Sequence, residues 1–149
     1  MHKKDLENYS KKDRQLIIDA FKKGATQLAR IKHPRILSLQ HQLEESKDSL
    51  AFATEPCFCS LSNAFGNHDN MPFPASKDFQ DFKLLEVEIK YGLMQVAEGL
   101  SFLNKDMKLM HRNICPESII INTNGAWKIA GFEMSVTNNN DPNDAVRIN

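Results

Sequence analysis

Polar side chains that could take part in chemistry gather in one short stretch, His111 to Ser118, and a glycine-centred stretch, Gly131 to Glu133, follows it closely. Asn113 carries a neutral amide, which can orient a hydroxyl group but cannot act as a base near neutral pH. A cysteine such as Cys115 becomes reactive only beside a cation or a helix N-terminus, so a packed thiol is the simpler interpretation. Asn113 and Cys115 by themselves therefore do not indicate a base or a nucleophile.

The order of these residues resembles the catalytic loop and the metal-binding loop of a protein kinase. A kinase carries H-R-D-x-K-P-E-N and then D-F-G, whereas this chain carries H-R-N-x-C-P-E-S from His111 and then G-F-E from Gly131. Asn113 and Gly131 have the spacing that a kinase has between its base Asp and its metal-binding Asp. The resemblance implies a pseudokinase, in which the kinase frame is kept without the reactive side chains.

Five positions differ from what phosphoryl transfer requires if the resemblance holds. They are Asn113 for the base Asp, Cys115 for the phosphate-facing Lys, Ser118 for the second metal's Asn, Gly131 for the magnesium-binding Asp and Gly24 for the helix C Glu. Glycine has no side-chain oxygen, and one serine hydroxyl would make a poor magnesium site. Because such residues act as a unit, we expect no catalytic residue and no metal site.

Other kinase positions keep the expected residue types. The four side chains that kinases stack between their lobes correspond to Leu28, Leu39, His111 and Phe132. These residues are expected to lie in the core, so His111 is interpreted as a packed histidine rather than as a metal ligand or a general base.

Adenine recognition would survive the substitutions because it uses the main chain. The resemblance places Thr54 as the gatekeeper, the carbonyl of Glu55 and the amide of Cys57 as candidate adenine contacts, and Ile120 as the apolar floor. No G-x-G-x-x-G motif occurs in the sequence. We therefore expect no cofactor, with ATP kept as an alternative.

Hydrophobic periodicity and turn signals predict the elements that must position these residues. Ser10 is a predicted N-cap, and apolar residues recur at steps of three and four from Ile17 to Ile31, which indicates a helix that His33-Pro34 would end. The remaining predicted elements are strands over 35–43 and 50–54, a short helix over 58–65, a loop over 66–78, a helix over 81–104 with Ile89, Leu93, Val96, Leu100 and Leu103 as its apolar stripe, and a hairpin of strands 119–122 and 126–129 around Asn124-Gly125.

This order predicts an α+β fold that matches the middle of a kinase: helix C, strands four and five, the hinge, helices D and E, and the catalytic-loop hairpin. We expect a partial kinase-like domain over 1–136 and a flexible tail, rich in Asn and Asp, over 137–149. The N-terminal strands and the C-terminal lobe helices of a kinase are expected to lie outside this chain.

The segments His33-Pro-Arg-Ile-Leu, Thr54-Glu-Pro and Gly125-Ala-Trp-Lys-Ile are similar to those of the Scy-like pseudokinase family, in its branch associated with clathrin-coated vesicles. The resemblance implies a scaffold or adaptor in vesicle traffic at the Golgi and endosomes, with clathrin or adaptor complexes as protein partners. It also implies a peripheral place on those membranes. The alternatives are a divergent kinase with residual ATP binding or phosphotransfer, and a nucleotide-sensing switch.

Composition limits the other function classes. Lys and Arg total 19, as do Asp and Glu, so a broad nucleic-acid-binding surface is not expected. The apolar runs are too short to span a membrane, and the N-terminus lacks the apolar stretch of a signal peptide. Three cysteines without paired metal-ligand spacing fit a reducing, cytoplasmic setting.

Overall fold

The computed structural model describes residues 1–69, 71 and 73–138. The first elements in chain order are η1 (Lys3–Leu6), α1 (Lys11–Arg30), β1 (Leu39–Glu45) and β2 (Leu50–Thr54). The later elements are β3 (Cys57–Ser60), α2 (Leu61–Ala64), α3 (Lys77–Gln80), α4 (Glu86–Lys105), β4 (Leu109–Met110), β5 (Ile119–Asn122), β6 (Trp127–Ile129), η2 (Phe132–Met134) and β7 (Val136–Thr137).

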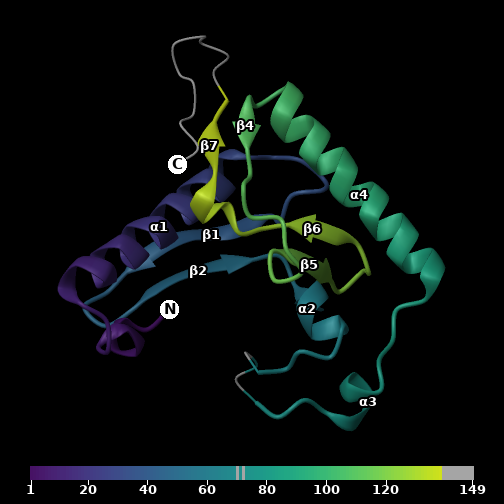
Figure 1. The fold of residues 1–149 in the computed structure, drawn as a ribbon, viewed down its shortest axis with the longest axis horizontal. Coiled ribbons are helices and arrows are strands. Elements are labelled where there is room, and N and C mark those ends of the chain that lie inside the picture. The colour runs from purple at the N-terminus through teal and green to yellow at the C-terminus, as the bar shows by residue number, and fades with distance from the viewer. Residues whose placement is uncertain (70, 72, 139–149) are drawn as a thin grey trace.

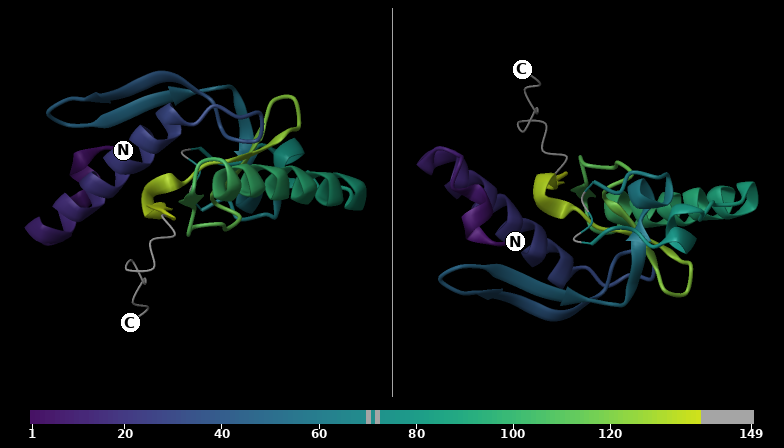
Figure 2. Two further views of the ribbon diagram at one scale, coloured as in Figure 1. Left: turned by 90° about the horizontal axis from the view of Figure 1, so that it is seen from above. Right: turned by 90° about the horizontal axis from the view of Figure 1, so that it is seen from below.

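Helix α1 and the antiparallel pair β1–β2 lie side by side at one end of the molecule, and α4 lies at the other end (Figure 2). The predicted start and end of α1 are confirmed. The Ser10 hydroxyl accepts a hydrogen bond from the amide of Asp13, as an N-cap does, and Ile31 leaves the helical conformation three residues before Pro34. Gly24 and Leu28 lie on the buried face of the helix.

The second half contains the antiparallel sheet β3–β5–β6 and the small pair β4–β7 (Figure 1). The predicted hairpin is confirmed: β5 and β6 pair around Gly125, which has a positive φ of 79°. The side-chain oxygen of Asn122 accepts hydrogen bonds from the amides of Asn124 and Ala126 and so closes the turn.

Helix α4 packs against β6 through two glycines. A Cβ atom added to Gly92 would lie 2.1 Å from the ring of Trp127, and one added to Gly99 would lie 2.7 Å from Cδ1 of Ile129. The amide of Trp127 also donates a hydrogen bond to the buried side chain of Gln95. Glycine is therefore required where the helix approaches the sheet.

The prediction of an apolar stripe on this helix was partly wrong. Leu93 is 57% exposed, while the buried positions are Gly92, Gln95, Val96, Gly99 and Leu103. Because the Trp127 ring packs on Gly92, the contact face is centred on small residues rather than on the largest apolar ones. The helix also begins at Glu86 rather than near residue 81, after the separate short helix α3.

Two other predicted boundaries were wrong. The strand predicted over 35–43 begins at Leu39, because residues 35–37 instead pair with β6: Ile129 donates to the carbonyl of Arg35, and Leu37 donates to the carbonyl of Ile129. The helix predicted over 58–65 is β3 followed by α2. Pairing with β5 holds the chain extended until Ser60, which then caps α2.

Strand β7 crosses the predicted domain boundary between residues 136 and 137, and the amide of Asn138 donates to the carbonyl of Lys108. The rest of the predicted tail, 139–149, lies outside the described residues. One core cluster joins both halves of the molecule and includes Leu28 from α1, Ile129 from β6 and Phe132 from η2.

Candidate functional site

The residues predicted at the degenerate kinase positions lie near η2, which packs against α1. His111 is buried, and its Nε2 donates a hydrogen bond to the carbonyl of Ala130 at 2.7 Å. Its Nδ1 accepts the amide of Asn113 at 3.2 Å. Burial lowers the pKa of His111, and this outweighs the hydrogen bond to Ala130 and the nearby charge of Glu133, which both raise it. A neutral imidazole with both nitrogens in use joins the two loops.

Asn113 is also tied into this framework. Its Nδ2 donates a long hydrogen bond, 3.4 Å, to the carbonyl of Gly131, and its Oδ1 accepts from the thiol of Cys115 at 3.8 Å. Asn113, which the resemblance aligns with the base of a kinase, therefore links the two loops through its amide donor. A carboxylate in its place could not donate to Gly131.

Ser118 closes a tight turn with Cys115. Its hydroxyl donates to the carbonyl of Cys115 at 3.0 Å and accepts the amide of Cys115 at 3.1 Å. The hydroxyl is buried, and this turn uses its proton and one of the two lone pairs of its oxygen.

Gly131 adopts a left-handed conformation, with φ of 73°. A Cβ atom there would lie 2.9 Å from Cβ of Ser118, closer than such atoms approach in proteins. Conformation and space therefore both favour glycine at this position.

The carboxylate of Glu133 lies between Gly24 and Gly131. A Cβ atom added to Gly24 would lie 3.0 Å from Oε1 of Glu133, and one added to Gly131 would lie 3.6 Å from Oε2. Within the described part of the chain, this carboxylate has no hydrogen-bond or ion-pair partner. Glu133 is not among the predicted site residues, although its place directly after Gly131-Phe132 is a signal in the sequence that could have indicated it.

The predicted interlobe residues come together in part. The rings of His111 and Phe132 meet edge to face, with centroids 4.7 Å apart. Phe132 and Leu28 are 1% and 4% exposed and belong to the same core cluster, against which Leu39 packs. The structure thus places all four residues in or against the core.

The hinge residues lie between β2 and β3. The carbonyl of Glu55 accepts hydrogen bonds from the Thr54 hydroxyl and from the Cys57 thiol, both at 3.1 Å. Cys57 is exposed at the start of β3, and Ile120 of β5 is partly buried. Glu55 and Cys57 thus lie near each other, but the predicted acceptor, the carbonyl of Glu55, already accepts two hydrogen bonds.

The side chain of Glu55 turns toward the body of the protein. It accepts hydrogen bonds from the amide of Ser38 and from Nδ2 of Asn122, and it lies 3.6 Å from Nζ of Lys128. Burial raises the pKa of Glu55, but these donors lower it by more, so the net pKa lies below its ordinary value. The hinge is held by a side-chain network that the sequence analysis did not predict.

The arrangement does not fit a kinase-type magnesium site, since Gly131 has no side-chain oxygen and the hydroxyl of Ser118 is committed to its turn. Over residues 1–69, 71 and 73–138, there is no group of three or more His, Cys, Asp or Glu side chains that could hold a metal. In the same residues, no helix has the length and apolar character needed to cross a bilayer.

The sequence of the chain is similar to those of known kinases and kinase-like proteins. The sequence pattern of the family described as "Protein tyrosine and serine/threonine kinase" matches residues 4–148. The chain is 54% identical to human SCY1-like protein 2 over 138 residues, which are 93% of this chain and 15% of that protein. The mouse SCY1-like protein 2 is 52% identical over the same share of both chains.

A more distant relative carries a name that bears on activity. The chain is 30% identical to the "Probable inactive serine/threonine-protein kinase scy1" of Dictyostelium discoideum, over 87% of this chain and 14% of that protein. The chain therefore spans only about a seventh of the length of these relatives. The predicted α+β, partial kinase-like fold is confirmed.

Proposed function

The chain belongs to the protein kinase family, among its SCY1-like members, and on that basis we propose that it is a catalytically inactive kinase-like module. We further propose that it acts as a scaffold or adaptor in clathrin-linked vesicle traffic at the Golgi and endosomes. Its partners would be proteins such as clathrin or adaptor complexes, and its place would be peripheral on coated vesicles. The traffic proposal rests on resemblance to the Scy-like family.

The hydrogen bond from Asn113 to the carbonyl of Gly131 carries the proposal of inactivity. It joins the two positions where a kinase has its base and its magnesium ligand, through an amide donor and a main-chain acceptor. Neither group can take up a proton from a substrate hydroxyl near neutral pH. The same two positions that would perform catalysis therefore hold the loops together.

A turnover assay tests this part. The chain would be incubated with ATP and magnesium, and phosphate release would be measured beside the Asn113→Ala variant. We expect no release above background from either protein. Magnesium-dependent release that disappears in Asn113→Ala would overturn the proposal in favour of a divergent kinase.

A binding assay tests the adaptor role. Purified clathrin and purified adaptor complexes would be passed over the immobilised chain, and binding would be measured by surface plasmon resonance. Saturable binding of either one is expected. If neither binds the chain, and a tagged chain is absent from purified coated vesicles, the trafficking proposal fails while the proposal of inactivity stands.

Nucleotide binding without turnover is the second candidate. It is favoured by the hinge, where Glu55 and Cys57 lie close together, and opposed by the two donors that already occupy the Glu55 carbonyl. ATP would raise the melting temperature of the chain in the presence of EDTA if the hinge bound adenine. An unchanged melting temperature at millimolar ATP would exclude nucleotide binding and leave protein binding as the remaining proposal.

A further inference from the structure

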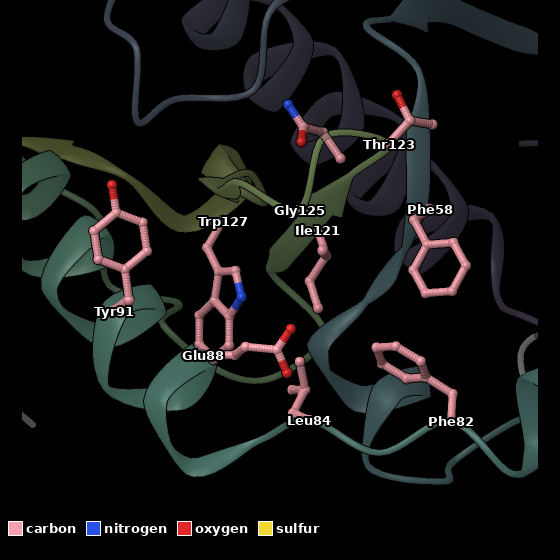
Figure 3. Close-up of a pocket in the computed structure, with 10 residues that line it drawn as sticks. Phe58, Phe82, Leu84, Glu88, Tyr91, Ile121, Thr123, Gly125 and Trp127 are labelled. Carbon is pink, nitrogen blue, oxygen red and sulfur yellow. The ribbon is translucent and has the colours of Figure 1, made fainter.

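A pocket of about 220 Å³ lies between the β5–β6 hairpin, β3 and the start of α4 (Figure 3). We call it the hairpin pocket. It is lined by Phe58, Phe82, Leu84, Glu88, Tyr91, Ile121, Asn122, Thr123, Gly125 and Trp127. Its volume is below that of pockets for drug-sized ligands and suits a single side chain or a fragment.

The side chains of Ile121 and Trp127 in the hairpin pocket lie on the face of the sheet opposite to Ile120, the predicted floor of an adenine site. Ile121 and Trp127 are paired across β5 and β6, so their side chains share one face. Ile120 and Lys128 are the next pair and share the other face, because successive side chains of a strand alternate. Binding in the hairpin pocket therefore does not require the face of the sheet that carries Ile120.

The walls of the pocket are apolar and aromatic. The rings of Phe58 and Phe82 meet edge to face with centroids 5.3 Å apart, and Phe79 packs against both. Ile121 and Trp127 form the floor, facing these rings across the pocket in Figure 3. Such walls accept an aliphatic stem or a planar group.

Two polar groups face this apolar space. The carboxylate of Glu88 reaches into the pocket, and the indole nitrogen of Trp127 is on the ring edge that faces it (Figure 3). One oxygen of Glu88 accepts the amide of Leu85 at 2.7 Å. In the described part of the chain, the other oxygen has no partner and the indole N–H has no acceptor. One free acceptor with negative charge and one free donor are therefore available to a ligand.

These features define the chemistry of the occupant. Glu88 is the sole charged residue among the ten lining residues, so a cationic group fits the pocket and an anionic group does not. Aromatic rings beside a carboxylate favour a guanidinium, which is planar and stacks on ring faces while it donates to the acid. The indole N–H requires an acceptor, such as the main-chain carbonyl that a peptide supplies.

We propose that the hairpin pocket binds an arginine side chain of a partner polypeptide, with the guanidinium on Glu88 and the aliphatic stem against Phe58, Phe82 and Trp127. A main-chain carbonyl of the same polypeptide accepts from the indole N–H of Trp127. This surface would add a recognition function on the face of the sheet opposite to Ile120.

Trp127 is the single tryptophan of the chain, so its indole N–H signal in NMR spectra reports on the pocket directly. The probe is the peptide acetyl-Ala-Ala-Arg-Ala-Ala-amide, titrated to millimolar concentration against the full chain. The comparison peptides carry citrulline, which is a neutral copy of arginine, or leucine at the central position. We expect a saturable shift of the indole signal with the arginine peptide and affinity about fivefold weaker with citrulline.

The variants separate the charge from the fold. Glu88→Gln keeps an oxygen for the amide of Leu85 but removes the charge, and it should weaken the arginine peptide about fivefold without changing the citrulline peptide. Glu86→Gln is the matched control, because Glu86 lies in the same helical turn but pairs with Lys90 outside the pocket. This variant should bind as the unmodified chain does, and equal melting temperatures show that both variants fold.

Three results would overturn the proposal. Equal affinity for the arginine and citrulline peptides would exclude a role of the Glu88 charge in binding. If no peptide shifted the indole signal, the pocket would be excluded as a docking site. Free N-acetyl-arginine amide that binds as tightly as the peptide would assign the pocket to a small molecule instead of a polypeptide.

Discussion

The carboxylate of Glu133 fills the space that a side chain at Gly24 would need. A Cβ atom added to Gly24 would lie 3.0 Å from both Cγ and Oε1 of Glu133. The kinase resemblance aligns Gly24 with the acid of helix C and Glu133 with the glycine that ends the D-F-G triplet. In the structure the glycine lies on α1 and the acid lies on η2, and the absent side chain of Gly24 makes room for Glu133.

A glutamate introduced at position 24 while Glu133 remains in place should therefore destabilise the fold. Gly24→Glu would place a second carboxylate and a larger side chain against Glu133, in space that is already filled. We expect the free energy of unfolding to fall by about 1–3 kcal/mol, because overpacking and like charge act together. Urea unfolding followed by circular dichroism measures the change.

A double mutant tests whether the two residues are coupled. Adding Glu133→Gly to Gly24→Glu removes the clash, so the pair should recover most of the lost stability, with an interaction energy of about 1 kcal/mol or more. Gly24→Ala is the control, since only the flexible end of Glu133 must move and alanine favours the helix. Additive effects of Gly24→Glu and Glu133→Gly would show that the residues do not meet.

The Asn113→Asp substitution should lower the stability of the protein and should not produce kinase activity. Asn113→Asp loses the donor to the carbonyl of Gly131 and places a carboxylate oxygen near that carbonyl. We expect a loss of about 1 kcal/mol in unfolding free energy, with no phosphate release from ATP. Asn124→Asp is an isosteric control on the exposed hairpin turn, where Asp-Gly is as suitable as Asn-Gly. Greater stability of Asn113→Asp would contradict the hydrogen bond as placed.

The contact between α4 and β6 predicts that replacing Gly92 destabilises the protein more than replacing Gly99. Gly92→Ala places a methyl group 2.1 Å from the buried Trp127 ring, which cannot move without shifting the sheet. We expect a loss of about 1–3 kcal/mol despite the better helix propensity of alanine. In Gly99→Ala the new methyl group would lie 2.7 Å from the flexible end of the Ile129 side chain, so this variant should lose less unfolding free energy than Gly92→Ala. Equal urea midpoints for the two variants would show that Trp127 does not pack on Gly92.

Stability should fall when the pH is lowered through the range where His111 takes up a proton. Its folded-state pKa lies below the ordinary value of about 6.5, so between those values the unfolded chain binds more protons than the folded one. The stabilisation is complete above about pH 6.5 and is lost as the pH falls through the folded pKa. In His111→Phe this contribution should be absent, so its melting temperature should depend less on pH between 7.5 and 5.5. An identical pH dependence in both proteins would exclude His111 as its source.

Local sequence signals predicted the elements whose causes are local. The N-cap of α1 at Ser10, its end before Pro34 and the β5–β6 turn at Gly125 depend on residues a few positions apart, and all three were confirmed. The limits of β1 and β3 were not predicted, because pairing with strands distant in the sequence sets them. Residues 35–37 run beside Ile129, and β3 remains extended because β5 holds it.

The sequence by itself determined which side chains stand at positions 24, 113 and 131, and the resemblance to kinases predicts from them that the acids of phosphoryl transfer are absent. Three relationships depend on tertiary structure alone. Glu133 lies against Gly24, the Trp127 ring packs on the face of α4 that contains Gly92, and Glu88 and Trp127 line one pocket. These relationships join residues 35 or more positions apart. Hydrophobic periodicity reports which face of an element is apolar, but only packing between elements fixes which side chains share the same space.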